Sequence, residues 1–270
     1  MADNFLERHY AEFEAKRNSL QQDHKLGKKQ VSRLHRFSTN IEGISLPTKF
    51  TDPFDYTPHP LCRLAADEVM SYIDTHPEWH DELQLGKMFG ILVVKNVLGQ
   101  IGFLAAFSGL LNKQNDLPYF VPAVYDMLKP NGHFKTEEKE ISLINHRIEQ
   151  LSTDEGQSAL ITTLKQERKQ RSIALQIWLF EQFILQNAYG ERKNLIKIFQ
   201  EKEQHLPPGG AGECAAPKLL QYAFLNKLQP IAMAEFWWGN SPKNEERIHG
   251  HFYPACEQKC RPILSFMLNY

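Results

Sequence analysis

The chain has 270 residues, of which 42% are hydrophobic and 23% are charged, and its formal net charge is −1 at pH 7. This composition is typical of a globular protein with one large domain or two smaller ones. A net charge this close to zero excludes a global basic field for nucleic acid, so RNA would have to meet a local patch or a partner domain. No stretch approaches the roughly 20 apolar residues of a membrane span, and the charged start, 1–20, is unlike a signal peptide. We therefore expect a cytoplasmic protein with no membrane partner.

Residues 1–44 are expected to form a charged N-terminal extension. Its apolar residues recur at helical spacing, and a basic run follows them: Phe5, Leu6, Tyr10 and Phe13, then Lys25, Lys28, Lys29 and Arg33. This pattern predicts an exposed helix followed by a solvated basic stretch.

The residues after this extension predict a mixed α/β core. One apolar face over 61–75 predicts a helix that ends at a His-Pro pair. Two short apolar runs, 87–94 and 101–108, predict a hairpin of buried strands. The last part of the chain predicts a helix at 213–224, a strand at 230–237 and a helix over 254–268 that begins at its cysteines.

Residues 111–204 predict a helical insertion in this core. From Glu137, apolar residues step by three and four as in a coiled-coil seam: Ile141, Ile144, Ile148 and Leu151. A turn at 152–156 and a second helix that is strongly apolar over 173–185 predict a projecting antiparallel hairpin, and a third helix is expected at 193–203.

A basic strip on the second helix of this hairpin is a candidate RNA contact. It consists of Lys165, Arg168, Lys169 and Arg171. Such side chains bind phosphate groups without reading sequence. A solvated charged face without a ligand is the alternative interpretation.

Three cysteines at predicted helix starts form a candidate metal site. Cys214 opens one helix, and Cys256 and Cys260 open another, where their spacing of four places both on one face. A helix N-terminus favours the thiolate that metals bind. Three thiolates can hold one zinc ion and leave a fourth position for water or another ligand. Ordinary buried thiols and a redox pair remain alternatives.

Other metal or ligand candidates are weaker. His249 and His251 precede the cysteine helix and could supply a fourth ligand, while His59 and Cys62 form a single H-x-x-C pair. Trp237 and Trp238 could stack on a base, although aromatic residues at the end of a buried strand usually belong to the core. The glycines at 209, 210 and 212 are expected to form a helix-entry turn, since no P-loop lysine follows them.

The order of these elements resembles that of the zinc-dependent nucleoside and nucleic-acid deaminases. That resemblance implies a deaminase-like sheet flanked by helices, built from 45–110 and 205–270, with 111–204 inserted. The deaminase pattern has a proton-carrying Glu two residues after its first ligand and a later Pro-Cys-x-x-Cys. Here Ala216 stands at the position of that Glu, and the cysteine pair has three residues between its members. Glu213 and Glu235 are nearby acids, but neither occupies the matching position.

Long motifs along the chain resemble the N-terminal region of large bacterial RluA-like RNA pseudouridine synthases. These motifs are DPFDYTPHPLCRLAADEV (52–69), GKMFGILVV (86–94), FLAAFSG (103–109), YFVPAVYDML (119–128), GAGECAAPKLLQYAF (210–224), PIAMAEFWWG (230–239) and HGHFYPACEQKCRPIL (249–264). The resemblance implies an association with RNA modification, with rRNA or tRNA as partner. The synthase reaction needs an Asp in an H-R-L-D-type motif, whereas His146-Arg147 is followed by Ile148-Glu149 here. No catalytic residue carries over, and the catalytic domain is expected in cis or in trans.

Three functions follow from the sequence. The chain can be an accessory, RNA-associated region of a pseudouridine synthase, a zinc hydrolase of deaminase type, or a scaffold that binds partners through its coiled-coil hairpin. Ala216 weakens the hydrolase because alanine cannot carry a proton.

Overall fold

The computed structural model describes residues 32–55, 57–152, 157–203, 205–243 and 245–269. Arg33–Tyr270 form one compact unit. The expected N-terminal helix, and the basic run after it up to residue 31, lie outside the described residues. The main chain of His35 exchanges two hydrogen bonds with that of Phe103. His35 is therefore attached to the edge of the hairpin at Phe103.

The centre of the body is a four-stranded antiparallel sheet with the strand order β2-β1-β5-β6. Its strands are β1 (Lys87–Lys95), β2 (Ile101–Phe107), β5 (Gln229–Trp238) and β6 (Phe252–Tyr253). The predicted hairpin is confirmed, and so is the prediction that the 230–237 strand joins its sheet, because β1 pairs with β2 on one side and with β5 on the other.

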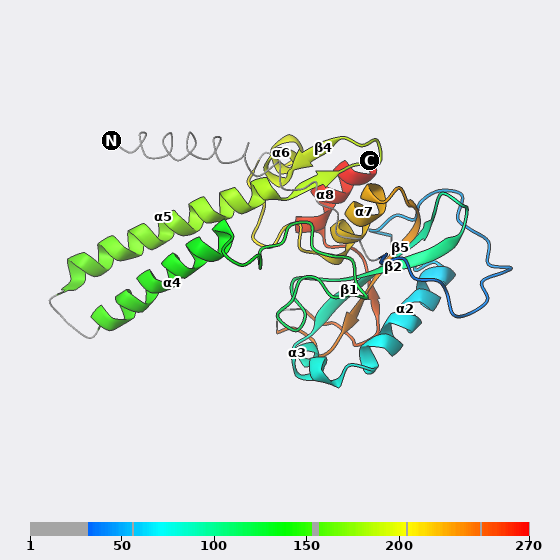
Figure 1. Cartoon of the computed structure of the whole chain (residues 1–270), viewed down its shortest axis with the longest axis horizontal. Coiled ribbons are helices and arrows are strands. Elements are labelled where there is room, and N and C mark those ends of the chain that lie inside the picture. Colours follow the sequence, from blue (N-terminus) through cyan, green and yellow to red (C-terminus); the bar gives the residue numbers. More distant parts are fainter. Residues whose placement is uncertain (1–31, 56, 153–156, 204, 244, 270) are drawn as a thin grey trace. The chain divides into compact units, whose positions relative to one another are not determined.

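Helices cover both faces of this sheet (Figure 1). Alternate side chains of β1 point to opposite faces, as a pleated strand requires. Ile91 and Val93 pack with α2 (Pro60–Asp74), whereas Leu92 and Val94 pack with α7 (Ala215–Leu225) and α8 (Glu257–Leu268). After α2, a short 3-10 helix (Pro77–Trp79) and α3 (His80–Gln84) lead into β1. The three long core helices lie where the sequence predicts them.

Helix α7 is almost entirely buried. Every residue from Ala215 to Ala223 is buried, including Lys218 and Gln221. Its first turn approaches the sheet at Gly90, where a Cβ atom would lie only 2.8 Å from the Cβ of Ala215. A glycine on β1 therefore lets the start of this helix rest directly on the sheet.

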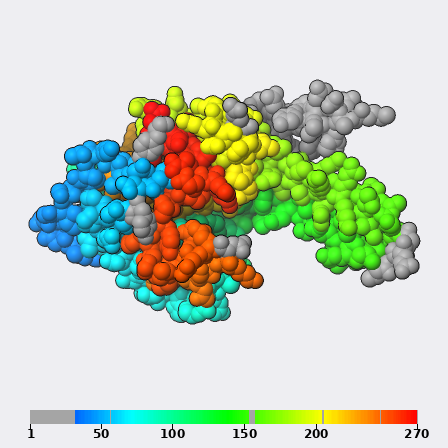
Figure 2. Space-filling view, turned by 180° about the vertical axis from the view of Figure 1, so that it is seen from behind, coloured from blue at the N-terminus to red at the C-terminus, as the bar shows by residue number. Residues whose placement is uncertain are grey.

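The predicted hairpin consists of α4 (His133–Leu151) and α5 (Ser158–Gln182), which pack side by side and extend away from the sheet (Figures 1 and 2). Ile148 and Leu164 are buried between them, and Leu175 and Phe180 are buried nearer the body. The coiled-coil geometry of this pair stays a prediction.

The sequence prediction is wrong just after α5. The apolar run was expected to continue the helix to residue 185, but α5 ends at Gln182, and β3 (Ile184–Gln186) pairs with β4 (Arg192–Asn194) before α6 (Leu195–Lys202). Gln221 of α7 explains the change. Its amide accepts from Gln186 N at 2.8 Å and donates to Ile184 O at 3.1 Å, so it binds extended backbone here.

Among the described helices, none is both long enough and apolar enough to cross a lipid bilayer.

Candidate metal centre

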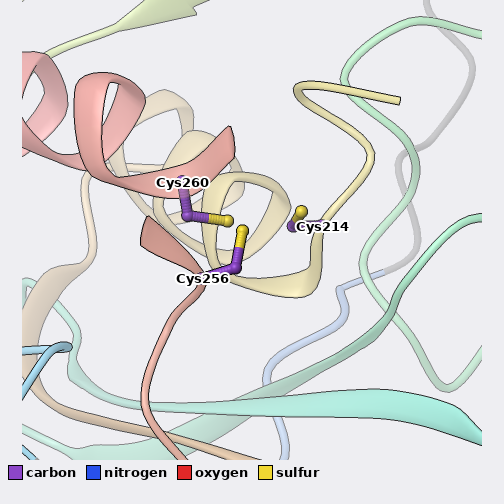
Figure 3. Close-up of side chains that lie close together, drawn as sticks. All are labelled: Cys214, Cys256 and Cys260. Atoms are coloured by element: carbon purple, nitrogen blue, oxygen red, sulfur yellow. The ribbon is translucent and has the colours of Figure 1, made fainter. Parts of the chain in front are cut away.

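The three predicted cysteine ligands converge in the folded chain (Figure 3). Their sulfur atoms all lie within 4.8 Å of one another. Cys214 is the N-cap of α7, Cys256 is the N-cap of α8, and Cys260 lies one turn further along α8. In a tetrahedral zinc site with Zn–S bonds of about 2.3 Å, neighbouring sulfurs are about 3.8 Å apart. The side chains therefore need to close by only about 1 Å to hold a zinc ion.

Local backbone geometry fixes the position of Cys214. Gly212, two residues earlier, has a φ of 85°, and a Cβ atom there would lie 2.7 Å from Cδ1 of Phe183. Only glycine meets both requirements without strain. The tight turn at 210–212 and the close approach at Gly90 together place the start of α7 between the sheet and α8.

The contacts among the three cysteine side chains shift their pKa values in different directions. Hydrogen bonds from Cys214 and Cys260 lower the pKa of Cys256 far below its usual range, and the backbone N–H groups of Lys259 and Cys260 add to this effect. The contact with Cys256 raises the pKa of Cys214, the contact with Cys260 lowers it, and burial raises it. Contacts with Cys214 and Cys256, followed by burial, raise the pKa of Cys260. Because metals bind cysteine as the thiolate, metal binding here would release protons from the cluster.

A buried carboxyl lies next to this centre. Glu235 of β5 is 5% exposed and pairs across the sheet with Gly90, and its Oε1 accepts a hydrogen bond from Ala216 N at 3.2 Å. Burial, and to a smaller extent the charge of Cys256, raise the pKa of Glu235 to about 8. The sequence places alanine where a deaminase has its Glu, and the structure brings a carboxyl to that alanine from another strand. In the sequence, the one sign of this role was that Glu235 is a charged residue inside an otherwise apolar strand.

The histidines and the fourth cysteine take no part in the cluster formed by the described residues. His249 Nδ1 accepts from Gly239 N at 3.0 Å, and its ring packs 4.1 Å from that of Trp238. His59 Nδ1 accepts from Leu61 N and caps α2. Cys62 is fully buried, and burial raises the pKa of its thiol to about 12, as expected for a core cysteine.

His251 and Trp237 also have structural contacts. The main chain of His251 bonds to those of Trp237 and Ile248, and the Trp237 ring lies 5.3 Å from the guanidinium of Arg247.

In the predicted basic strip on α5, the two arginines contact neighbouring side chains, whereas the two lysines are exposed. Arg168 donates to Asn145 of α4 at 2.8 Å, and Arg171 forms ion pairs with Glu137 at 3.1 Å and Glu167 at 3.2 Å. Lys165 and Lys169 are exposed. Because the two arginines link the hairpin together, the lysines are the better candidates for a phosphate contact.

No family model, curated protein or solved structure matches the chain.

Proposed function

We propose that this chain is an accessory, RNA-associated region of an RluA-like pseudouridine synthase, and that one zinc ion held by Cys214, Cys256 and Cys260 stabilises its core. The observation that carries the proposed zinc site is the convergence of three sulfur atoms from two helix N-termini to within 4.8 Å. Soft thiolate ligands favour zinc over hard cations. Bound zinc would supply a cross-link between α7 and α8.

The association with a pseudouridine synthase rests on the long motifs that resemble that family. Several of them build the candidate centre: residues 210–224 contain Cys214, residues 230–239 contain Glu235, and residues 249–264 contain Cys256 and Cys260. The His146-Arg147 pair lies inside α4 and is followed by Ile148-Glu149, so it does not supply the catalytic Asp. We therefore propose that isomerisation belongs to a synthase domain that acts with this chain.

RNA binding is proposed for the exposed lysines of α5. Changing Lys165 and Lys169 together to Glu should weaken the binding of single-stranded RNA by about 10-fold at low salt, and should lower the salt slope of the binding constant by about one per lysine. Both side chains point to solvent, so the change should leave the hairpin intact. A filter-binding titration at low and moderate salt measures both quantities.

The matched control changes Lys197 and Lys202 of α6 to Glu. Both are also exposed, and the change in net charge is the same. If the two double variants and the wild type bind RNA equally, the α5 strip is a solvated face. If the two variants lose the same affinity, the effect comes from net charge alone.

A second candidate function is hydrolytic deamination, and the position of Glu235 favours it. Its carboxyl bonds to Ala216 N and can hold or accept a proton beside the centre. It also lines a cavity of about 20 Å³, which is large enough for one water molecule. The accessory function predicts no ammonia release from cytidine or adenosine by the zinc-loaded chain. Ammonia release that is lost in Glu235→Ala but kept in Glu213→Ala would favour the hydrolase instead.

A further inference from the structure

A buried lysine follows Cys214 by one helical turn. Lys218 is 3% exposed and lies in a helix that is enclosed on all sides. Removing an ammonium group from water is costly unless it gains strong partners.

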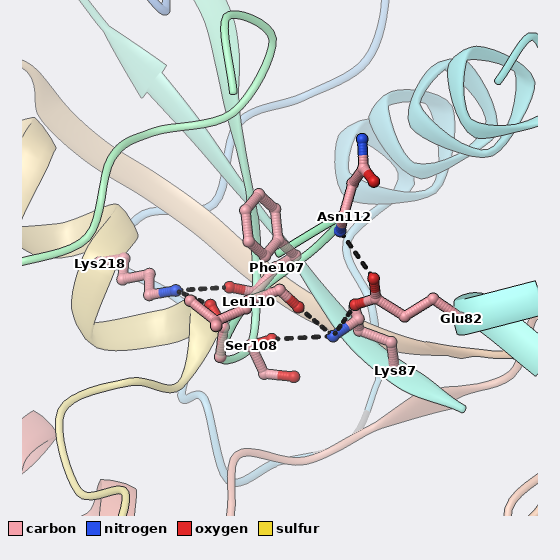
Figure 4. A network of polar contacts seen from close by, with 8 residues as sticks. Glu82, Lys87, Phe107, Ser108, Leu110, Asn112 and Lys218 are labelled. Atoms are coloured by element: carbon pink, nitrogen blue, oxygen red, sulfur yellow. Dashed lines mark hydrogen bonds and ion pairs between the residues drawn. The ribbon is translucent and has the colours of Figure 1, made fainter. Parts of the chain in front are cut away.

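The partners of Lys218 are backbone carbonyls at the end of β2 and just after it (Figure 4). Its Nζ donates to Phe107 O at 2.9 Å and to Gly109 O at 3.1 Å, and it lies 5.0 Å from the centre of the Phe107 ring. Lys87 of β1 takes the alternate carbonyls, those of Ser108 and Leu110. Two ammonium groups thus bind four successive carbonyl oxygens.

The same segment holds the residue just before Cys214. The N–H of Gly109 donates to the carbonyl of Glu213 at 3.0 Å. The carbonyl of Glu213 and the ammonium of Lys218 are thus both hydrogen-bonded to residues 107–109. Cys214 lies between these two residues in the chain. Cys214 has no side-chain capping bond of its own as the N-cap of α7, so these outside contacts fix its backbone.

The positive charge of Lys218 is opposite in sign to the net charge expected of the metal centre. A zinc ion with three thiolates has a net charge of −1, and a buried anion needs a compensating cation nearby. Burial is the largest influence on Lys218 and lowers its pKa to about 8, while the electrostatic interactions with Glu213 and Cys214 favour its charged form. Lys87 forms its ion pair with Glu82 at 3.5 Å on the other side of the segment.

We propose that Lys218 is a positioning residue for the metal centre, which fixes Cys214 through residues 107–109 and balances the charge of the three-thiolate site. This inference rests on the proposed zinc site. Lys87 serves as the matched comparison, because it binds the same segment from β1 and its ammonium hydrogen bonds go to Ser108 and Leu110 rather than to α7.

The test compares Lys218→Met with Lys87→Met in the full chain. Competition with a chromophoric chelator measures zinc affinity, and the absorption bands of bound Co²⁺ report the geometry of the thiolate ligands. Lys218→Met should bind zinc about 10- to 100-fold more weakly, as with other outer-shell partners of metal ligands, and should shift the cobalt bands. Lys87→Met should bind zinc within about 2-fold of wild type, because its loss leaves the contacts of α7 in place.

Each outcome bears on the inference. A folded Lys218→Met that binds zinc like wild type overturns it, and so does an equal loss of affinity in Lys87→Met. If Lys218→Met does not fold, Lys218→Gln carries the test, because it keeps an N–H donor but removes the charge. Weaker zinc binding in a natively folded Gln variant supports the inference, whereas wild-type affinity, or unfolding of both variants, contradicts it. A wild-type chain that binds no zinc refutes the metal centre itself and is a separate result.

Discussion

Removing zinc from the full chain is expected to lower its thermal unfolding midpoint by about 8–16 °C. A ligand that binds only the folded state adds about 4 kcal/mol of stability at a free concentration 1,000 times its dissociation constant. For a chain of this size, 1 kcal/mol corresponds to about 2–4 °C. Thermal melts followed by circular dichroism, with saturating zinc and with excess chelator, measure the difference.

Substitutions at the cysteines show whether this increment comes from the proposed ligands. Cys256→Ser should abolish the difference between the zinc and chelator melts, since Ser supplies no thiolate. Cys62→Ser should melt at a lower temperature overall, because Cys62 is fully buried, yet keep the zinc-dependent difference. An undiminished zinc increment in Cys256→Ser would show that the metal binds elsewhere.

The second large effect concerns the pH dependence of the metal-free chain. Burial raises the pKa of Glu235 from its usual value near 4.5 to about 8. Between these values the unfolded state loses the proton while the folded state keeps it, so stability is full below pH 4.5 and falls as pH rises through 8. The cost above pH 8 is at most on the order of 5 kcal/mol. Glu235→Gln should remove this decline, because it stays neutral and keeps an oxygen for Ala216 N.

Urea unfolding at pH 5 and pH 8.5, with chelator present, measures this effect. Glu235→Gln should gain stability relative to wild type at pH 8.5 and show little difference at pH 5. Glu213→Gln is the matched control, since Glu213 is a partly exposed carboxyl next to the same centre, and it should follow wild type. Parallel pH profiles for wild type and Glu235→Gln would mean that this carboxyl is ionised in the fold.

The core could be predicted from sequence because its elements have clear periods and clear ends. The apolar face of α2 stops at Pro77, and the two strands of the hairpin are separated by a turn at Asn96–Gly99. The positions of Cys214 and Cys256 at helix starts could also be predicted from the sequence. The Gly-rich turn and the Pro residues around them mark where each helix begins.

The β3–β4 hairpin could not be predicted in this way. Its strands have three residues each, too few to show alternation, and they continue the apolar run of α5. The bonds from Gln221 that hold this segment extended come from a helix more than thirty residues later. Tertiary contact overrides the local helical pattern here.

The polar residues around the metal centre stand out in the sequence, but their partners could not be predicted from it. Lys218 and Glu235 each interrupt an apolar run, but their partners are backbone groups of distant segments. In the same way, the pairing of Arg168 and Arg171 with α4 depends on the register between two helices. Such pairings change which side chains remain free for a ligand.

Zinc K-edge X-ray absorption of the purified full chain, combined with its metal content, tests the central claim most directly. We predict one zinc ion per chain with three sulfur neighbours at about 2.3 Å, and loss of this signal in Cys214→Ser, Cys256→Ser and Cys260→Ser. A folded chain that takes up no zinc when supplied with it, or that binds zinc through nitrogen and oxygen atoms only, would contradict the account.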